Sequence, residues 1–139
     1  MSAIAKTQYR KEIAFWQRVL GLRDWQITFR ETDTEGVSEA GGGQATVACY
    51  TCDDLRRKAV LYFNRDSPDE DGLAHTVAHE GIHVVGDKFI QFAGRLVDLV
   101  PEGPGRELIY KQFCDEWETF VDDIARAMLR LKGKREVAG

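Results

Sequence analysis

The spacing of apolar residues changes its period along this chain, and that change restricts the fold more than any other sequence feature. Residues 7–20 carry apolar side chains at the three- and four-residue intervals of a helix. Residues 25–30, 44–52 and 58–64 instead form short apolar or alternating stretches, which are typical of strands. Helical spacing returns from about residue 70 onward. A helix, then strands, then helices predicts an α+β domain.

Glycine and polar residues predict where the early elements end. We expect residues 31–43, which include four glycines, to form a flexible loop. The polar stretch 53–57 is predicted to be a turn between the second and third strands, which gives a small antiparallel sheet. Ser67 or Asp69 is expected to cap a helix over residues 70–85, and Gly86 is expected to end it.

Two further helices are predicted in the second half of the chain. Residues 89–100 have helical apolar spacing, and the stretch 101–105 contains two prolines and two glycines that interrupt it. A long last helix is expected over about 106–132. Its apolar stripe has six members: Phe113, Trp117, Phe120, Val121, Ile124 and Met128.

Size and charge limit the classes of function. With 139 residues, we expect a single domain spanning residues 1–139. The formal charge of −4 argues against a general nucleic-acid-binding surface. No apolar run is long enough for a membrane span, and the charged N-terminus is unlike a signal peptide, so we expect a cytoplasmic protein. The three cysteines are then expected to be reduced; Cys49 and Cys52 are interpreted as strand-packing residues.

All three histidines of the chain lie within residues 74–89. His79 and His83 are four residues apart on one helix face, about 6 Å apart along the axis, so both imidazoles can reach one tetrahedral zinc ion. Glu80 points about 100° round the helix, where it can act as general base on a zinc-bound water. This is the H-E-x-x-H signature of zinc peptidases. His75 is about 12 Å from His83 along the axis, and is interpreted as a residue at the helix start rather than a ligand.

A third zinc ligand has to come from elsewhere in the chain. The extended H-E-x-x-H-x-x-G-x-x-H pattern fails because Phe89 occupies its last position, which leaves a carboxylate or a cysteine. Glu116 and Glu118 both lie at the edges of the apolar stripe of the last helix. We favour Glu118, because Asp122 one turn later can hold the free ring nitrogen of a ligating histidine. Glu116 and Cys114 are the alternatives.

This pattern resembles the gluzincins, in which a glutamate on a later helix follows H-E-x-x-H. In that family the third ligand opens a Glu-x-x-x-Asp stretch, which residues 118–122 match. The size and the order of elements resemble the minimal gluzincins and the small H-E-x-x-H proteins common in phages and prophages. The resemblance implies a zincin-like fold with a small sheet that contains antiparallel strands, a zinc-site helix and a C-terminal helix that carries the glutamate. Residues 58–64 would form the upper rim of a cleft, with a peptide lying along them as an added strand.

The function that this resemblance implies is hydrolysis of peptide bonds by a zinc metallopeptidase, with a peptide or protein as substrate. His79, His83 and Glu118 would bind Zn²⁺, and Glu80 would be the catalytic base. One alternative is a non-catalytic gluzincin-like domain that keeps zinc for stability and binds a protein partner. Another is a metal-dependent hydrolase of a non-peptide bond. Glu80 favours an enzyme, because a purely structural site has no use for a base at that position.

Overall fold

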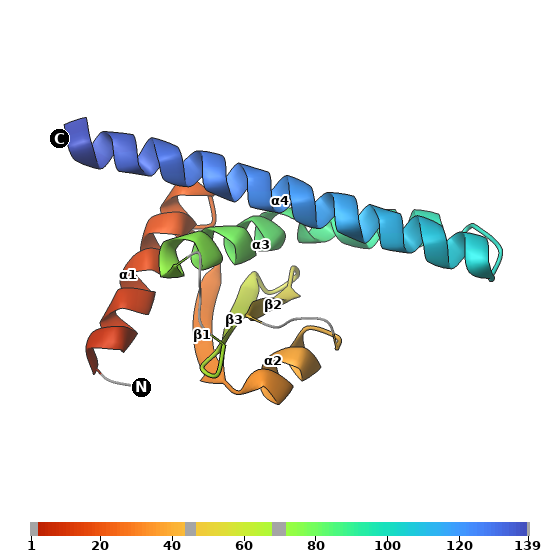
Figure 1. Cartoon of the computed structure of the whole chain (residues 1–139), viewed down its shortest axis with the longest axis horizontal. Coiled ribbons are helices and arrows are strands. Elements are labelled where there is room, and N and C mark those ends of the chain that lie inside the picture. The colour runs from red at the N-terminus through yellow and green to blue at the C-terminus, as the bar shows by residue number, and fades with distance from the viewer. Residues whose placement is uncertain (1–2, 44–46, 68–71, 139) are drawn as a thin grey trace. The chain divides into compact units, whose positions relative to one another are not determined.

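The computed structural model describes residues 3–43, 47–67 and 72–138 and confirms the α+β class. Its elements are α1 (Ala3–Val19), β1 (Gln26–Thr32), α2 (Thr34–Ala40), β2 (Ala48–Asp53), β3 (Lys58–Asn64), α3 (Leu73–Val97) and α4 (Pro104–Ala138) (Figure 1). Internal contacts divide the chain into two compact units, Met1–Val85 and Gly86–Gly139, with the boundary inside α3. The expected single domain stays a prediction. Among the described residues, no helix has the length and apolarity to cross a membrane.

The three strands form a mixed sheet in the order β1-β3-β2. β2 and β3 are antiparallel, as expected for a hairpin, but β1 and β3 are parallel. The expected antiparallel pairing is therefore confirmed for β2 and β3, and it is wrong for β1. The reason is that the chain leaves β1 through α2 before it enters β2, and the hairpin then returns β3 in the direction of β1. As a result β3 is the central strand, and β1 and β2 are the edge strands.

The helix α2 replaces part of the flexible loop that was expected over residues 31–43. Its cap is Asp33, whose carboxylate accepts a hydrogen bond from the Gly36 N–H at 2.9 Å. Val37 is fully buried, so the short helix has an apolar anchor. The glycines of this segment suggested a loop. Two other residues favour the helix: Asp33, three positions ahead of Gly36, caps it, and Val37 is its one buried side chain.

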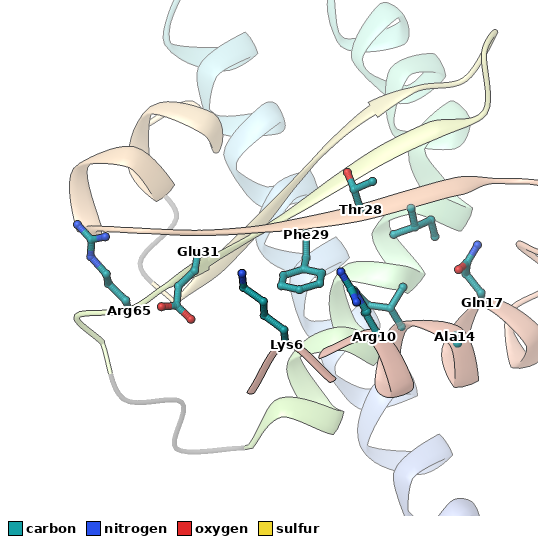
Figure 2. A pocket seen from close by; sticks show the side chains of 10 residues that line it. Lys6, Arg10, Ala14, Gln17, Thr28, Phe29, Glu31 and Arg65 are labelled. Carbon is teal, nitrogen blue, oxygen red and sulfur yellow. The ribbon is translucent and has the colours of Figure 1, made fainter. Parts of the chain in front are cut away.

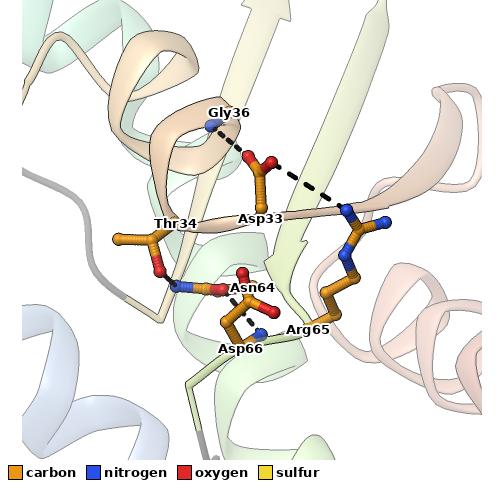
Figure 3. A network of polar contacts seen from close by, with 6 residues as sticks. All are labelled: Asp33, Thr34, Gly36, Asn64, Arg65 and Asp66. Carbon is orange, nitrogen blue, oxygen red and sulfur yellow. Dashed lines mark hydrogen bonds and ion pairs between the residues drawn. The ribbon is translucent and has the colours of Figure 1, made fainter.

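A polar network joins the start of α2 to the end of β3 (Figure 3). The Asn64 side-chain amide donates to the Thr34 hydroxyl at 3.0 Å, and its carbonyl oxygen accepts from the Asp66 N–H at 2.9 Å. Arg65 lies 3.9 Å from the Asp33 carboxylate. Asn64 is buried, so these hydrogen bonds satisfy a polar side chain that would otherwise destabilise the unit.

The core of the first unit lies on the face of the sheet that carries Leu61 and Phe63, both nearly inaccessible to solvent. Tyr9 of α1 packs on this face, with ring centroids 4.9 Å from Phe29 and 4.7 Å from Phe63. The opposite face of the sheet carries Cys49, whose thiol donates to the Val37 carbonyl of α2 at 3.4 Å. The two faces of the sheet thus contact different helices of the first unit, α1 on one face and α2 on the other.

α3 does not end at Gly86 but continues to Val97, so the separate helix expected over 89–100 is mostly its second half. Gly86 lies inside the helix because the indole of Trp117 occupies the space beside it: an added Cβ would be 2.5 Å from the Trp117 ring. Of the two residues expected to cap this helix, Asp69 lies outside the described residues, and Ser67 is six residues ahead of the first helical residue.

This close contact makes Gly86→Ala an informative substitution in the second unit. We expect it to lower the free energy of unfolding by about 1–3 kcal/mol, because a rigid indole has to move away from the new methyl group. Gly94→Ala on the same helix is the matched control. Nothing lies within 4 Å of its added Cβ, so it should raise stability by up to about 1 kcal/mol through helix propensity. Urea unfolding followed by tryptophan fluorescence measures both, and equal stability of the two variants would contradict the packing argument.

The last helix, α4, is longer than the range 106–132 expected for it. Within its predicted apolar stripe, Val121 is fully buried, but Phe120 is 54% exposed and Ile124 is 37% exposed. Phe89 packs against Phe113 and Trp117 in the second unit, with ring centroids 6.4 and 5.7 Å apart.

Candidate metal centre

The helix α3 places the three histidines in a row along one face. The rings of His79 and His83 have centroids 4.9 Å apart, and their Nε2 atoms are 3.2 Å apart. The ring of His75 is the next in the row, with its centroid 5.9 Å from that of His79. The helical i, i+4 spacing seen in the sequence therefore brings two imidazole nitrogens to the same point.

The distance of 3.2 Å between the Nε2 atoms of His79 and His83 fits a shared cation. Two nitrogens bound to tetrahedral zinc at roughly 2.0–2.1 Å are separated by about 3.3 Å. Without a cation, the same distance requires one ring to donate its Nε2 hydrogen to the other. The arrangement is thus suited to holding either a metal ion or a proton between the two rings.

Tyr50 of β2 fixes the orientation of His83. Their rings are stacked, with centroids 5.3 Å apart and planes 9° apart, and His83 is only 5% exposed. A stacked and buried imidazole loses little further freedom when it binds a ligand. Tyr50 is not recognisable from the sequence alone, because its proximity to His83 depends on the packing of β2 against α3 and not on spacing within one element.

Glu80 is 6% exposed, so its side chain does not lie on a solvated helix surface. Burial raises the pKa of the Cys49 thiol to about 11, and the negative charge of Glu80 adds to this rise. The Cys49 thiol is therefore protonated at neutral pH.

Cys49 and Cys52 are both free and lie three residues apart in β2, so they point to opposite faces of the sheet. The expected structural role of this pair in the strand is in line with that arrangement.

His75 lies in the first turn of α3, as expected, but it is buried, with 7% of its surface exposed. Four apolar residues flank the motif on this helix, a pattern that predicts a buried helix: Val77, Ile82 and Val84 are each no more than 7% exposed, whereas Leu73 is only half-buried. The start of α3 is therefore part of the core of the first unit.

The remaining predicted site residues lie on α4 in the second unit. Glu118 and Glu116 are both exposed, and Asp122 is half-buried. The Arg126 Nε donates a hydrogen bond to the Asp122 carboxylate at 2.8 Å. Within the first unit the structure brings together His79, His83 and Tyr50, whereas the assignment of Glu118 as third ligand stays a prediction.

The strand expected to form the rim of a cleft is not available for a substrate. β3 (Lys58–Asn64) is hydrogen-bonded on both sides, to β1 and to β2, so no peptide can be added to it. The edge strand that carries Tyr50 beside the histidines is β2. The prediction chose β3 because it is the most apolar strand and directly precedes the histidine helix in sequence, but the most apolar strand is the one buried in the centre of the sheet.

No protein family, curated protein or solved structure matched this chain when its sequence and its fold were compared with them.

Proposed function

We propose that this chain is a zinc-dependent metallopeptidase with a zincin-like, gluzincin-type site, acting on a peptide or protein in the cytoplasm. The observation that carries the proposal is the 3.2 Å distance between the Nε2 atoms of His79 and His83, with the buried carboxylate of Glu80 next to them in sequence. Two converging imidazoles supply two of the three protein ligands that catalytic zinc usually takes, and one buried acid beside them can act as the base in metal-assisted hydrolysis.

Each residue has a distinct role in the proposed reaction. His79 and His83 would hold the ion, and Tyr50, which stacks on the His83 ring, would keep that ring in place. Zinc held there would supply Lewis acidity, which polarises the scissile carbonyl and lowers the pKa of water. Glu80 accepts the proton of the attacking water and passes it to the leaving amine, a contribution of about 10²–10⁴ in rate for a positioned base.

The third ligand in this proposal is Glu118. Its support is the sequence pattern: Glu118 and Asp122 reproduce the Glu-x-x-x-Asp spacing of the gluzincins, and both are on α4. Glu116 is two residues away and lacks an acid one turn later, which makes it the natural comparison.

The substrate is proposed to lie along β2 instead of β3. The Asn64 N–H donates to the Val47 carbonyl at 2.8 Å, so the odd-numbered residues of this strand face β3. The main-chain groups of Ala48, Tyr50 and Cys52 then point to the open edge, where an extended peptide can form hydrogen bonds. Tyr50 would thus serve both the substrate edge and the orientation of His83.

The direct test is metal analysis combined with peptide digestion. We expect the purified protein to bind one equivalent of Zn²⁺ and to cleave members of a broad peptide library, as detected by mass spectrometry. Removal of zinc with a chelator should stop cleavage, and added zinc should restore it. Stoichiometric zinc without any cleavage would favour the non-catalytic protein-binding alternative. Failure to bind any divalent metal would overturn both.

A further inference from the structure

A second site lies on the opposite edge of the sheet, between α1 and β1 (Figure 2). It is a cavity of about 720 Å³, within the range of about 300–1,000 Å³ that is usual for ligand sites. One wall is a stripe of α1 that runs from Lys6 to Gln17, and the other is the segment of β1 from Ile27 to Glu31. None of these residues belongs to the proposed metal centre.

Positive charge is spread along this cavity. Three cationic side chains line it, Lys6, Arg10 and Arg65, against the single carboxylate of Glu31. Arg65 is 3.9 Å from Asp33, and both side chains are about half exposed, so that ion pair is weak. Among the residues that the structure describes, no acidic group lies within 4.0 Å of Lys6 or Arg10. In Figure 2 the labelled side chains follow β1 from Arg65 at one end to Gln17 at the other.

The main chain of β1 offers hydrogen bonds along the same cavity. Gln26 donates its N–H to the Arg57 carbonyl at 2.8 Å, which fixes the even-numbered residues as those bonded to β3. The Thr32 carbonyl accepts from the Arg65 N–H at 2.9 Å, which confirms this parity at the other end of the strand. Three odd-numbered residues therefore present their N–H and C=O groups at the open edge: Ile27, Phe29 and Glu31.

We infer that this groove binds an extended acidic segment of a partner protein, which pairs with the edge of β1 while its carboxylates contact Lys6, Arg10 and Arg65. The dimensions agree: Ile27 to Glu31 spans about 13 Å of strand, and Lys6 to Gln17 spans about 16 Å of helix. A ligand of four or five extended residues fills that length. The inference concerns binding alone and does not depend on the proposed metallopeptidase activity.

A peptide fits this groove better than a nucleic acid does. The row of N–H and C=O groups on β1 is matched by another extended main chain, and a sugar-phosphate backbone has no such alternating donors and acceptors. Phe29 is the aromatic residue of the lining, and Tyr9 already stacks on its ring at 4.9 Å and 11°, which leaves less of it for a base.

The inference is tested with isotope-labelled full-length protein and three probes: an alternating Glu-Val octapeptide, the same peptide with N-methyl groups on alternate residues, and a single-stranded oligonucleotide. We expect the first peptide to shift the amide signals of Ile27, Phe29 and Glu31 and the N-methylated one to bind at least tenfold more weakly. Equal binding of the two peptides would mean charge attraction without strand pairing and would overturn the inference. So would shifts caused by the oligonucleotide alone.

Charged side chains beside an edge strand can also serve only to prevent aggregation, without binding a ligand. Variants of the charged residues distinguish this protective role from binding. Combined Lys6→Gln and Arg10→Gln substitutions should weaken binding of the Glu-Val peptide on the order of tenfold, and Glu31→Gln should strengthen it severalfold. Lys11→Gln is the matched control, since Lys11 is exposed on α1 but does not line the groove. A protein that binds no acidic peptide, or a Lys6–Arg10 variant as effective as the Lys11 control, would overturn the inference.

Discussion

Replacing Glu80 with glutamine is expected to lower kcat/KM for any peptide substrate by about 10²–10⁴ while zinc content and thermal stability stay unchanged. Glutamine has nearly the same shape as glutamate but cannot accept the proton of the attacking water. Because Glu80 is buried, a variant of equal volume is needed to keep the packing at the start of α3 intact. Progress curves on the best substrate from the peptide library measure the loss directly.

The control for this experiment is Glu39→Gln, which removes an exposed carboxylate from α2 and should leave kcat/KM unchanged. The Cys49 thiol gives a second readout. In Glu80→Gln its pKa should fall from about 11, because one cause of the rise is removed, but it should stay above its ordinary value, since burial remains. An active Glu80→Gln protein would show that the carboxylate is not the base and would favour a structural role for the motif.

Local patterns in the sequence were sufficient for the features that depend on a single helix. The spacing of His79 and His83 predicted a shared face, and their Nε2 atoms do meet at 3.2 Å. The burial of Val77, Ile82 and Val84 likewise follows from their apolar character. In each case one element positions every residue involved, so no long-range contact has to be known.

Features that depend on packing between distant segments were not predictable in this way. From the sequence, Gly86 was predicted to end a helix. It lies inside α3 instead, because the indole of Trp117 occupies the space where a side chain would be. The order of the strands depends on where α2 places β2. That order leaves β1 and β2, and not β3, with an open edge. Tyr50 is 33 residues before His83 in sequence, and no motif connects them.

Substitution of the proposed zinc ligands is expected to produce the second large effect. Structural zinc sites bind with about 10–16 kcal/mol, so one of four ligands contributes roughly 3 kcal/mol, or more than 100-fold in affinity. We therefore expect His79→Ala, His83→Ala and Glu118→Ala each to weaken zinc binding by at least about 100-fold in a competition assay with a chelating dye. Because His83 is buried and stacked on Tyr50, thermal unfolding of the zinc-free proteins has to be compared in parallel.

Two substitutions serve as controls for the ligand series. His75→Ala should change zinc affinity by less than about tenfold, because His75 precedes His79 by a full helical turn and cannot reach an ion held between His79 and His83. Glu116→Ala should retain one equivalent of zinc. If Glu118→Ala retains it and Glu116→Ala loses it, the third ligand is Glu116, while the role of the two histidines stands. If His79→Ala and His83→Ala both retain full affinity, the 3.2 Å separation of their nitrogens reflects a shared proton, and the metallopeptidase proposal fails.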